Sequence, residues 1–207
     1  MCKDAKPFLD MSEDFSKYFN VITMDFRGHG KSSGLFTFTA REYIDLKAVV
    51  DYAEKECKYD RIFLLGFSLG AAISVIYTEK YKNINKVIGV STPTDFDKIE
   101  NHFLKKEAVL PAIEKFEFGK SPNIRPGNIA LKKIKPIDII SDIAPIPILF
   151  ISGKKDPIIH NWHAEKLFEK AQDPKKIVVF EEGFHAEDIF REYRGEFVDT
   201  CVEWYLD

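Results

Sequence analysis

Three residues of types suited to covalent hydrolysis occur along the chain, namely Ser68, Asp156 and His185. A serine hydroxyl is a weak nucleophile at neutral pH, so it needs a neighbouring base such as histidine. That base needs an acid to orient it. Together the three types could carry out nucleophilic attack on an acyl carbon, provided that the fold brings them into contact.

The surroundings of Ser68 favour this chemistry. Residues 66–70 read GFSLG, an apolar run at 61–65 precedes them, and a helix-compatible run at 71–77 follows. A strand, a tight turn and a helix are the context of a nucleophile elbow, in which the serine backbone is strained. We expect Gly66 and Gly70 to be needed because residues at these positions crowd the neighbouring backbone. The alternative is a glycine-lined turn with a capping serine.

Asp156 and His185 each come soon after an apolar run, at 146–151 and at 177–180. Ligands of open α/β sheets bind at the carboxyl ends of the strands, so all three residues are predicted to converge at one edge. Taken singly, Asp156 could be a turn residue before Pro157, and His185 could be a residue at a helix entry.

Other residues are weaker candidates. Asp95 follows a predicted strand and could replace Asp156 as the acid, although a turn or cap role suits it better. His160 and His163 lack the carboxylate or cysteine pattern that completes a metal site, so we interpret them as solvated helix residues. We place His102 on the surface of an insertion, and we assign His29 to a glycine-rich loop. No metal or cofactor is predicted.

Apolar runs alternate with helical patterns along the chain, which predicts an α/β fold with a doubly wound, mostly parallel sheet. The runs are continuously apolar, as in strands covered on both faces. Strands are expected at 20–26, 61–65, 86–91, 146–151 and 177–180. Helices are expected after a capping box at 39–42, at 71–77, near 160–171 and at 187–206.

Residues 96–143 interrupt this alternation and contain no clear strand. One helical face would carry Ile99, Phe103, Leu110, Ile113 and Phe116, and Pro111 is expected to start a new turn. The segment is either a surface excursion or a small lid over Ser68. We treat residues 1–207 as a single domain that contains this lid-like insertion.

Composition narrows the class of protein. The 207 residues suit one domain. The formal net charge of -3 argues against the excess of positive charge that is typical of nucleic-acid-binding proteins. No apolar run approaches the roughly 20 residues of a membrane span, and no secretion signal opens the chain. Three scattered cysteines make neither a disulfide framework nor a metal cluster. We therefore expect a reduced, cytoplasmic setting and no membrane partner.

Four segments resemble the α/β-hydrolase superfamily, and most of all its small carboxylesterases: residues 25–32 (DFRGHGKS), 66–70 (GFSLG), 152–156 (SGKKD) and 183–187 (GFHAE). The likeness runs from about residue 15 to the C-terminus. It implies that Ser68 is the nucleophile, His185 the general base and Asp156 its orienting acid. It also implies that Leu69 gives one oxyanion-hole N–H.

The resemblance fails at the front of the chain. Family members carry a strand that ends in a His-Gly pair, and the residue after that pair gives the second oxyanion N–H. Met1 or Cys2 stands about there, which suggests a truncated start. In the family this strand lies between those matching 20–26 and 61–65, so we expect either a gap with unpaired backbone groups or a sheet closed over it. We also expect slower turnover than in an N-terminally extended chain.

The leading hypothesis is therefore a serine hydrolase that cleaves small-molecule carboxylic esters. Thioester or peptide hydrolysis would use the same three residues. A different class of alternative is a truncated, non-catalytic α/β-hydrolase fragment with a binding or structural role. The sequence names neither the acyl group nor the alcohol, and it leaves the oligomeric state open.

Overall fold

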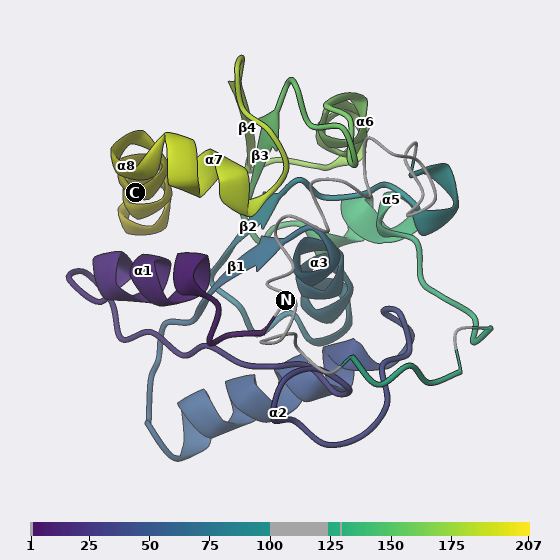
Figure 1. Ribbon diagram of the computed structural model, residues 1–207. Helices are drawn as coiled ribbons and strands as arrows, with labels where there is room; N and C mark the ends of the chain where they lie inside the picture. Colours follow the sequence, from purple (N-terminus) through teal and green to yellow (C-terminus); the bar gives the residue numbers. More distant parts are fainter. Residues whose placement is uncertain (1, 100–123, 129) are drawn as a thin grey trace.

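The computed structural model describes residues 2–99, 124–128 and 130–207 (Figure 1). Its centre is a four-stranded sheet in the order β1-β2-β3-β4, in which every pairing is parallel. The strands are β1 (Phe63–Phe67), β2 (Lys86–Val90), β3 (Ile148–Gly153) and β4 (Lys175–Phe180). The predicted α/β class and the parallel sheet are confirmed.

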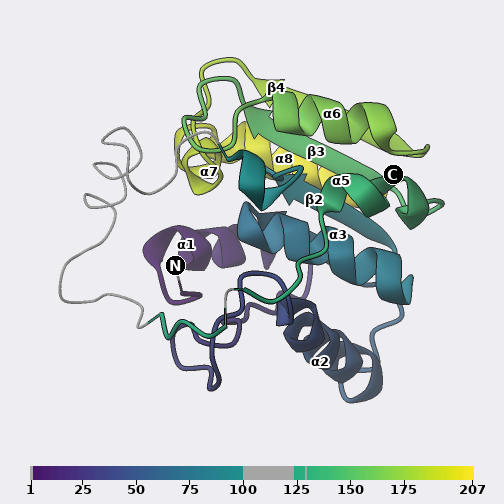
Figure 2. The ribbon, with the colours of Figure 1, turned by 90° about the vertical axis from the view of Figure 1, so that its right-hand side faces the viewer.

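Helices cover both faces of this sheet, which makes the fold doubly wound (Figures 1 and 2). One core packs β-strand side chains against α2 (Glu42–Lys55), α3 (Leu69–Tyr81) and α6 (Trp162–Lys170). The other core packs them against α1 (Lys6–Phe15), α7 (Glu187–Glu192) and α8 (Arg194–Leu206). The short helices are η1 (Phe96–Lys98), α5 (Pro136–Ile139) and η2 (Ile140–Ile143).

Residues 20–26 do not form the predicted strand. A strand exists only where a neighbour completes its ladder of hydrogen bonds, and no strand among the described residues pairs with this segment. The edge of β1 that faces away from β2 likewise has no strand partner in the described part of the chain. Of the two expectations for this region, the structure shows the gap rather than the closed sheet.

Two helix boundaries also differ from prediction. The capping box predicted at Thr39 and Glu42 is wrong, because it is Thr37 that contacts the buried Glu42 carboxylate, through its N–H at 2.6 Å and its hydroxyl at 2.9 Å. Phe38 and Thr39 both have positive φ, and the chain turns back there to bring Thr37 to the helix start. The helix expected over 187–206 is divided in two at Tyr193.

Helix α1 was not predicted, although a signal for it is present. A proline stands in its first turn, and Phe8, Met11 and Phe15 recur at helical spacing. Met11 and Phe15 are buried in the core that α7 and α8 also line. The segment before residue 20 therefore covers one face of the sheet.

The predicted insertion at 96–143 lies largely outside the described residues, as do His102 and Pro111. Of its described parts, Pro126 forms an isolated parallel bridge with Phe36, and α5 and η2 pack against α3. The lid and the single domain stay predictions. None of the described helices is both long and apolar enough to cross a bilayer.

Candidate active site

Ser68 occupies a strained turn between β1 and α3, with φ 49° and ψ -110°. Its N–H donates to the carbonyl of Val90 at 2.8 Å, which fixes the turn against the end of β2. A Cβ at Gly66 would lie 2.5 Å from the carbonyl oxygen of Gly70, so glycine is required there. A Cβ on Gly70 would meet nothing within 4 Å, so the predicted crowding at that position is wrong.

His185 lies against Asp156, with 2.8 Å between Nδ1 and Oδ2. Asp156 is buried, and its Oδ1 accepts the N–H groups of Ile158 at 2.9 Å and Ile159 at 2.8 Å. Burial alone would raise the pKa of Asp156, but the facing His185 and these two N–H groups outweigh it and hold that pKa below its ordinary value of 3.8. The carboxylate therefore stays charged opposite the imidazole.

Backbone packing brings the loops that carry these two residues together. A Cβ at Gly153 would lie 2.3 Å from the carbonyl oxygens of both Gly183 and Phe184, so only glycine permits the approach. The N–H of Lys155 donates to the carbonyl of Gly183 at 3.0 Å. The loop after β4 is thus held directly on the loop after β3.

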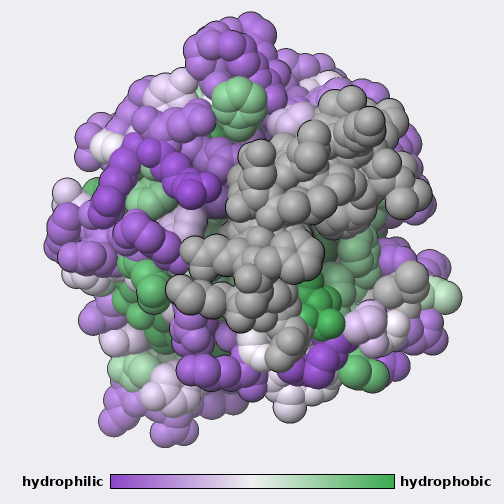
Figure 3. All heavy atoms as spheres, in the orientation of Figure 1, coloured by the Kyte–Doolittle hydropathy of each residue, from purple (hydrophilic) through white to green (hydrophobic). Residues whose placement is uncertain are grey.

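Ser68, Leu69, His185 and Cys2 all line one cavity of about 1250 Å³. The cavity continues along the open edge of β1, between residues 19–26 and 59–70. Its lining is mostly apolar, and Figure 3 shows hydrophobic side chains (green) at the surface between the positions of α1 and α2. The space is large enough for a small-molecule ligand beside Ser68.

The N-terminal segment is attached to this region by Asp25, whose Oδ1 accepts the N–H of Lys3 at 2.7 Å. Gly30, at φ 47°, lets its loop close on that carboxylate, because a Cβ there would lie 2.3 Å from Asp25 Oδ2. This attachment holds the chain next to Cys2 near the cavity.

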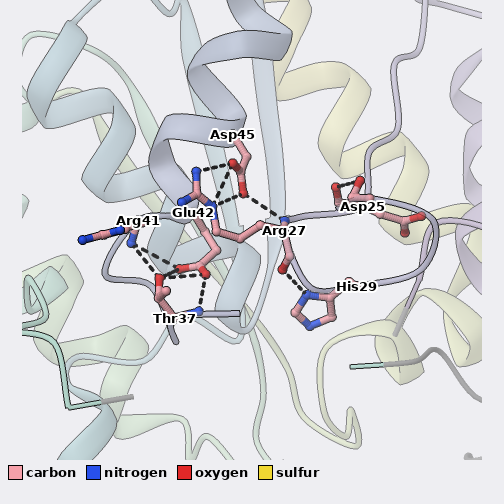
Figure 4. A network of polar contacts seen from close by, with 8 residues as sticks. Asp25, Arg27, His29, Thr37, Arg41, Glu42 and Asp45 are labelled. Atoms are coloured by element: carbon pink, nitrogen blue, oxygen red, sulfur yellow. Dashed lines mark hydrogen bonds and ion pairs between the residues drawn. The ribbon is translucent and has the colours of Figure 1, made fainter. Parts of the chain in front are cut away.

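Figure 4 shows the polar contacts that stabilise the loop around Asp25. Arg27 makes hydrogen bonds through its side chain and its N–H to Asp45 of α2. His29 places Nδ1 3.1 Å from the carbonyl oxygen of Arg27, and its ring meets Phe36 edge-on. Burial lowers the pKa of His29 below its ordinary value of 6.5. These contacts fit the predicted loop role of His29.

The other predicted candidates have different surroundings. Asp95 caps η1 by accepting the N–H of Asp97, and it pairs with Lys135 at 2.5 Å. His163 is fully buried, with Nδ1 3.1 Å from the N–H nitrogen of Thr94, so its predicted place among solvated residues is wrong. Among the described residues, no group of three or more His, Cys, Asp or Glu side chains could hold a metal ion.

Comparisons with known proteins agree with this architecture. A family model described as alpha/beta hydrolase fold matches residues 2–116, which is more than half of the chain. Uncharacterized protein YfhR of Escherichia coli K12 is 27% identical over 195 residues, which cover 89% of this chain and 62% of that protein. The alpha/beta hydrolase domain-containing protein WAV2 of Arabidopsis thaliana is 30% identical over 181 residues, covering 80% of this chain and 54% of WAV2. The chain thus spans little more than half the length of these relatives.

Solved structures show the same fold at lower identity. A Pyrococcus furiosus esterase has a TM-score of 0.78 at 24% identity, over 98% of this chain and 77% of that chain. A Paleococcus ferrophilus monoacylglycerol lipase has a TM-score of 0.69 at 21% identity, over 94% of this chain and 86% of that chain. At these identities the likeness concerns the arrangement of strands and helices.

Proposed function

This chain belongs to the alpha/beta hydrolase fold family, and from that premise we propose that it hydrolyses carboxylic esters through an acyl-enzyme on Ser68. One observation carries the proposal. The strained serine and His185 line the same cavity, while the imidazole contacts a buried, charged Asp156. A nucleophile, a base and an orienting acid are the minimum set for this reaction.

The steps follow from the roles of the three side chains. A proton on Nδ1 of His185, donated to Asp156, makes Nε2 the accepting nitrogen of the neutral ring. In the proposed reaction Ser68 Oγ attacks the acyl carbon while Nε2 takes its proton. His185 then passes that proton to the leaving alcohol as the ester C–O bond breaks. Water, deprotonated by the same nitrogen, attacks the acyl-enzyme and frees the carboxylic acid and Ser68.

The developing oxyanion needs donors, and two are proposed. Leu69 opens α3, so its N–H belongs to the first turn, whose N–H groups have no carbonyl partner within the helix. The dipole of α3 favours negative charge at the same end. Cys2 lines the cavity together with Leu69 and is our candidate for the second donor.

The mostly apolar lining of the cavity favours esters of apolar acyl groups as the small-molecule substrate. Thioesters and peptides could react by the same steps, but no contact in the described part of the chain selects for a sulfur leaving group or a peptide backbone. A non-catalytic fragment would bind such molecules without turning them over.

The test is turnover of p-nitrophenyl esters of rising acyl length by the wild type and by Ser68→Ala. We expect a measurable kcat for the wild type and a kcat/KM that depends on the acyl length of the ester. In Ser68→Ala, turnover should fall to background. Both proteins should show the same thermal melting temperature, because the hydroxyl is proposed to do chemistry rather than packing. Turnover that survives in a folded Ser68→Ala variant would show that Ser68 is not the nucleophile. A folded wild type without turnover would favour the alternative of a non-catalytic fragment.

A further inference from the structure

The end of β2 contacts both loops that carry the proposed nucleophile and base. The carbonyl of Val90 accepts the N–H of Ser68 at 2.8 Å. The next residue, Ser91, accepts the N–H of Ala186 on its hydroxyl oxygen at 3.0 Å. Ala186 directly follows His185. Two adjacent residues therefore connect the Ser68 turn to the His185 loop.

The contact between Ser91 and Ala186 is buried and lies where the backbone is constrained. Ser91 is 0% exposed and Ala186 is 1% exposed. Both have φ 48°, a region that non-glycine residues rarely adopt and that persists only when surrounding contacts hold it. Ala186 is also the residue before α7, so its N–H has no acceptor inside that helix. The Ser91 hydroxyl supplies the acceptor.

We propose that Ser91 is a positioning residue that sets the place of His185 relative to Ser68 by holding the backbone of Ala186. Ser91 is not among the described residues that line the cavity, so it acts through Ala186 rather than on the substrate. The Asp156 contact orients the imidazole ring, whereas the Ser91 contact fixes the backbone that carries it. The expected effect on turnover rests on the proposed function, whereas the positioning of His185 does not.

The kinetic test removes the hydroxyl in two ways. Ser91→Ala removes only the hydroxyl, and Ser91→Gly also relieves the strain of the positive φ, so a fault in folding from that strain would affect the first variant and not the second. We expect each to lower kcat by about 10²-fold, the effect of a misplacement near 1 Å, with KM changed less than about twofold. Ser91→Cys, which keeps a weak acceptor, should be intermediate.

The matched control is Thr78→Val, which removes another fully buried hydroxyl, one that donates to the carbonyl of Ser74 within α3 at 2.7 Å. It should leave kcat unchanged, and its comparison with Ser91→Ala at equal folded fraction separates the loss of a buried hydroxyl from the loss of the acceptor for Ala186. Equal kcat in Ser91→Ala and the wild type would overturn the proposal. A loss of kcat that Thr78→Val shares would also overturn it, because the effect would then be one of general stability.

A second readout does not depend on ester hydrolysis. The proton shared by His185 Nδ1 and Asp156 should give a low-field resonance in the proton NMR spectrum, assigned by its absence in Asp156→Asn. We expect this resonance to shift or broaden in Ser91→Ala and to stay unchanged in Thr78→Val. That result with an inactive wild type would sink the proposed esterase activity and leave the positioning role supported. An unchanged resonance in Ser91→Ala would count against the positioning role whatever the activity.

Discussion

At the residue scale, the choice of acid depends on contacts rather than on position after a strand. Asp156 and Asp95 each follow a strand of the sheet, and each carboxylate is buried. Asp156 faces His185, whereas Asp95 faces Lys135 and the start of η1. From the sequence either residue could be the acid, and the side-chain partners seen in the structure distinguish Asp156 from Asp95.

We therefore predict that Asp156→Asn lowers kcat by about 10³- to 10⁴-fold, because the amide neither stabilises an imidazolium nor selects the Nδ1–H tautomer. Asp95→Asn should leave kcat within a few-fold of the wild type and act on stability through Lys135. Steady-state kinetics of the two variants on one ester, at equal folded fraction by circular dichroism, measures the difference. If Asp95→Asn were the damaging change, the acid would have been assigned to the wrong strand.

At the element scale, local patterns predicted what depends on near neighbours in the chain. The strand-turn-helix around Ser68 was predictable because its apolar runs and glycines lie within about twenty residues. The contact of Ser91 with Ala186 was not, because it joins residues 95 positions apart in the chain. Residues 20–26 read as a strand by composition, yet pairing depends on a neighbour that the segment cannot supply.

The start of α2 gives a direct test at this scale. The Thr37 hydroxyl both donates to the Glu42 carboxylate and accepts the N–H of Arg41 at 3.0 Å. The hydroxyl of Thr39 is buried without a hydrogen-bond partner in the described part of the chain. We predict that Thr37→Val lowers the free energy of unfolding by about 1 kcal/mol, as for a lost cap.

Thr39→Val is the matched control, since it also replaces a hydroxyl by a methyl group on a β-branched side chain. It should leave the free energy of unfolding unchanged or raise it, because a buried hydroxyl without a partner is costly. Urea unfolding of both variants measures the two values. The reverse order would restore Thr39 as the capping residue.

At the scale of the whole molecule, the open edge of β1 is the feature with the widest consequence. Ser68 N–H and the carbonyl of Ile62 both bond toward β2. Backbone groups alternate along a strand, so those of Phe63, Leu65 and Phe67 point to the other edge. The cavity lies on that side, and Val21 and Ile22 line it while 39% and 43% exposed.

An apolar sheet edge of this kind promotes pairing between molecules. We predict concentration-dependent association of the chain, and we predict that the double change Val21→Lys and Ile22→Lys reduces it, because charged side chains beside the open edge of β1 oppose its burial against a second copy. The matched control is Leu9→Lys with Ile44→Lys, which adds the same charge at positions 52% and 43% exposed that do not line the cavity. Sedimentation velocity across a concentration series measures the three proteins. A wild type that stays monomeric throughout, or a control that dissociates as fully as the edge variant, would show that the edge of β1 does not drive association.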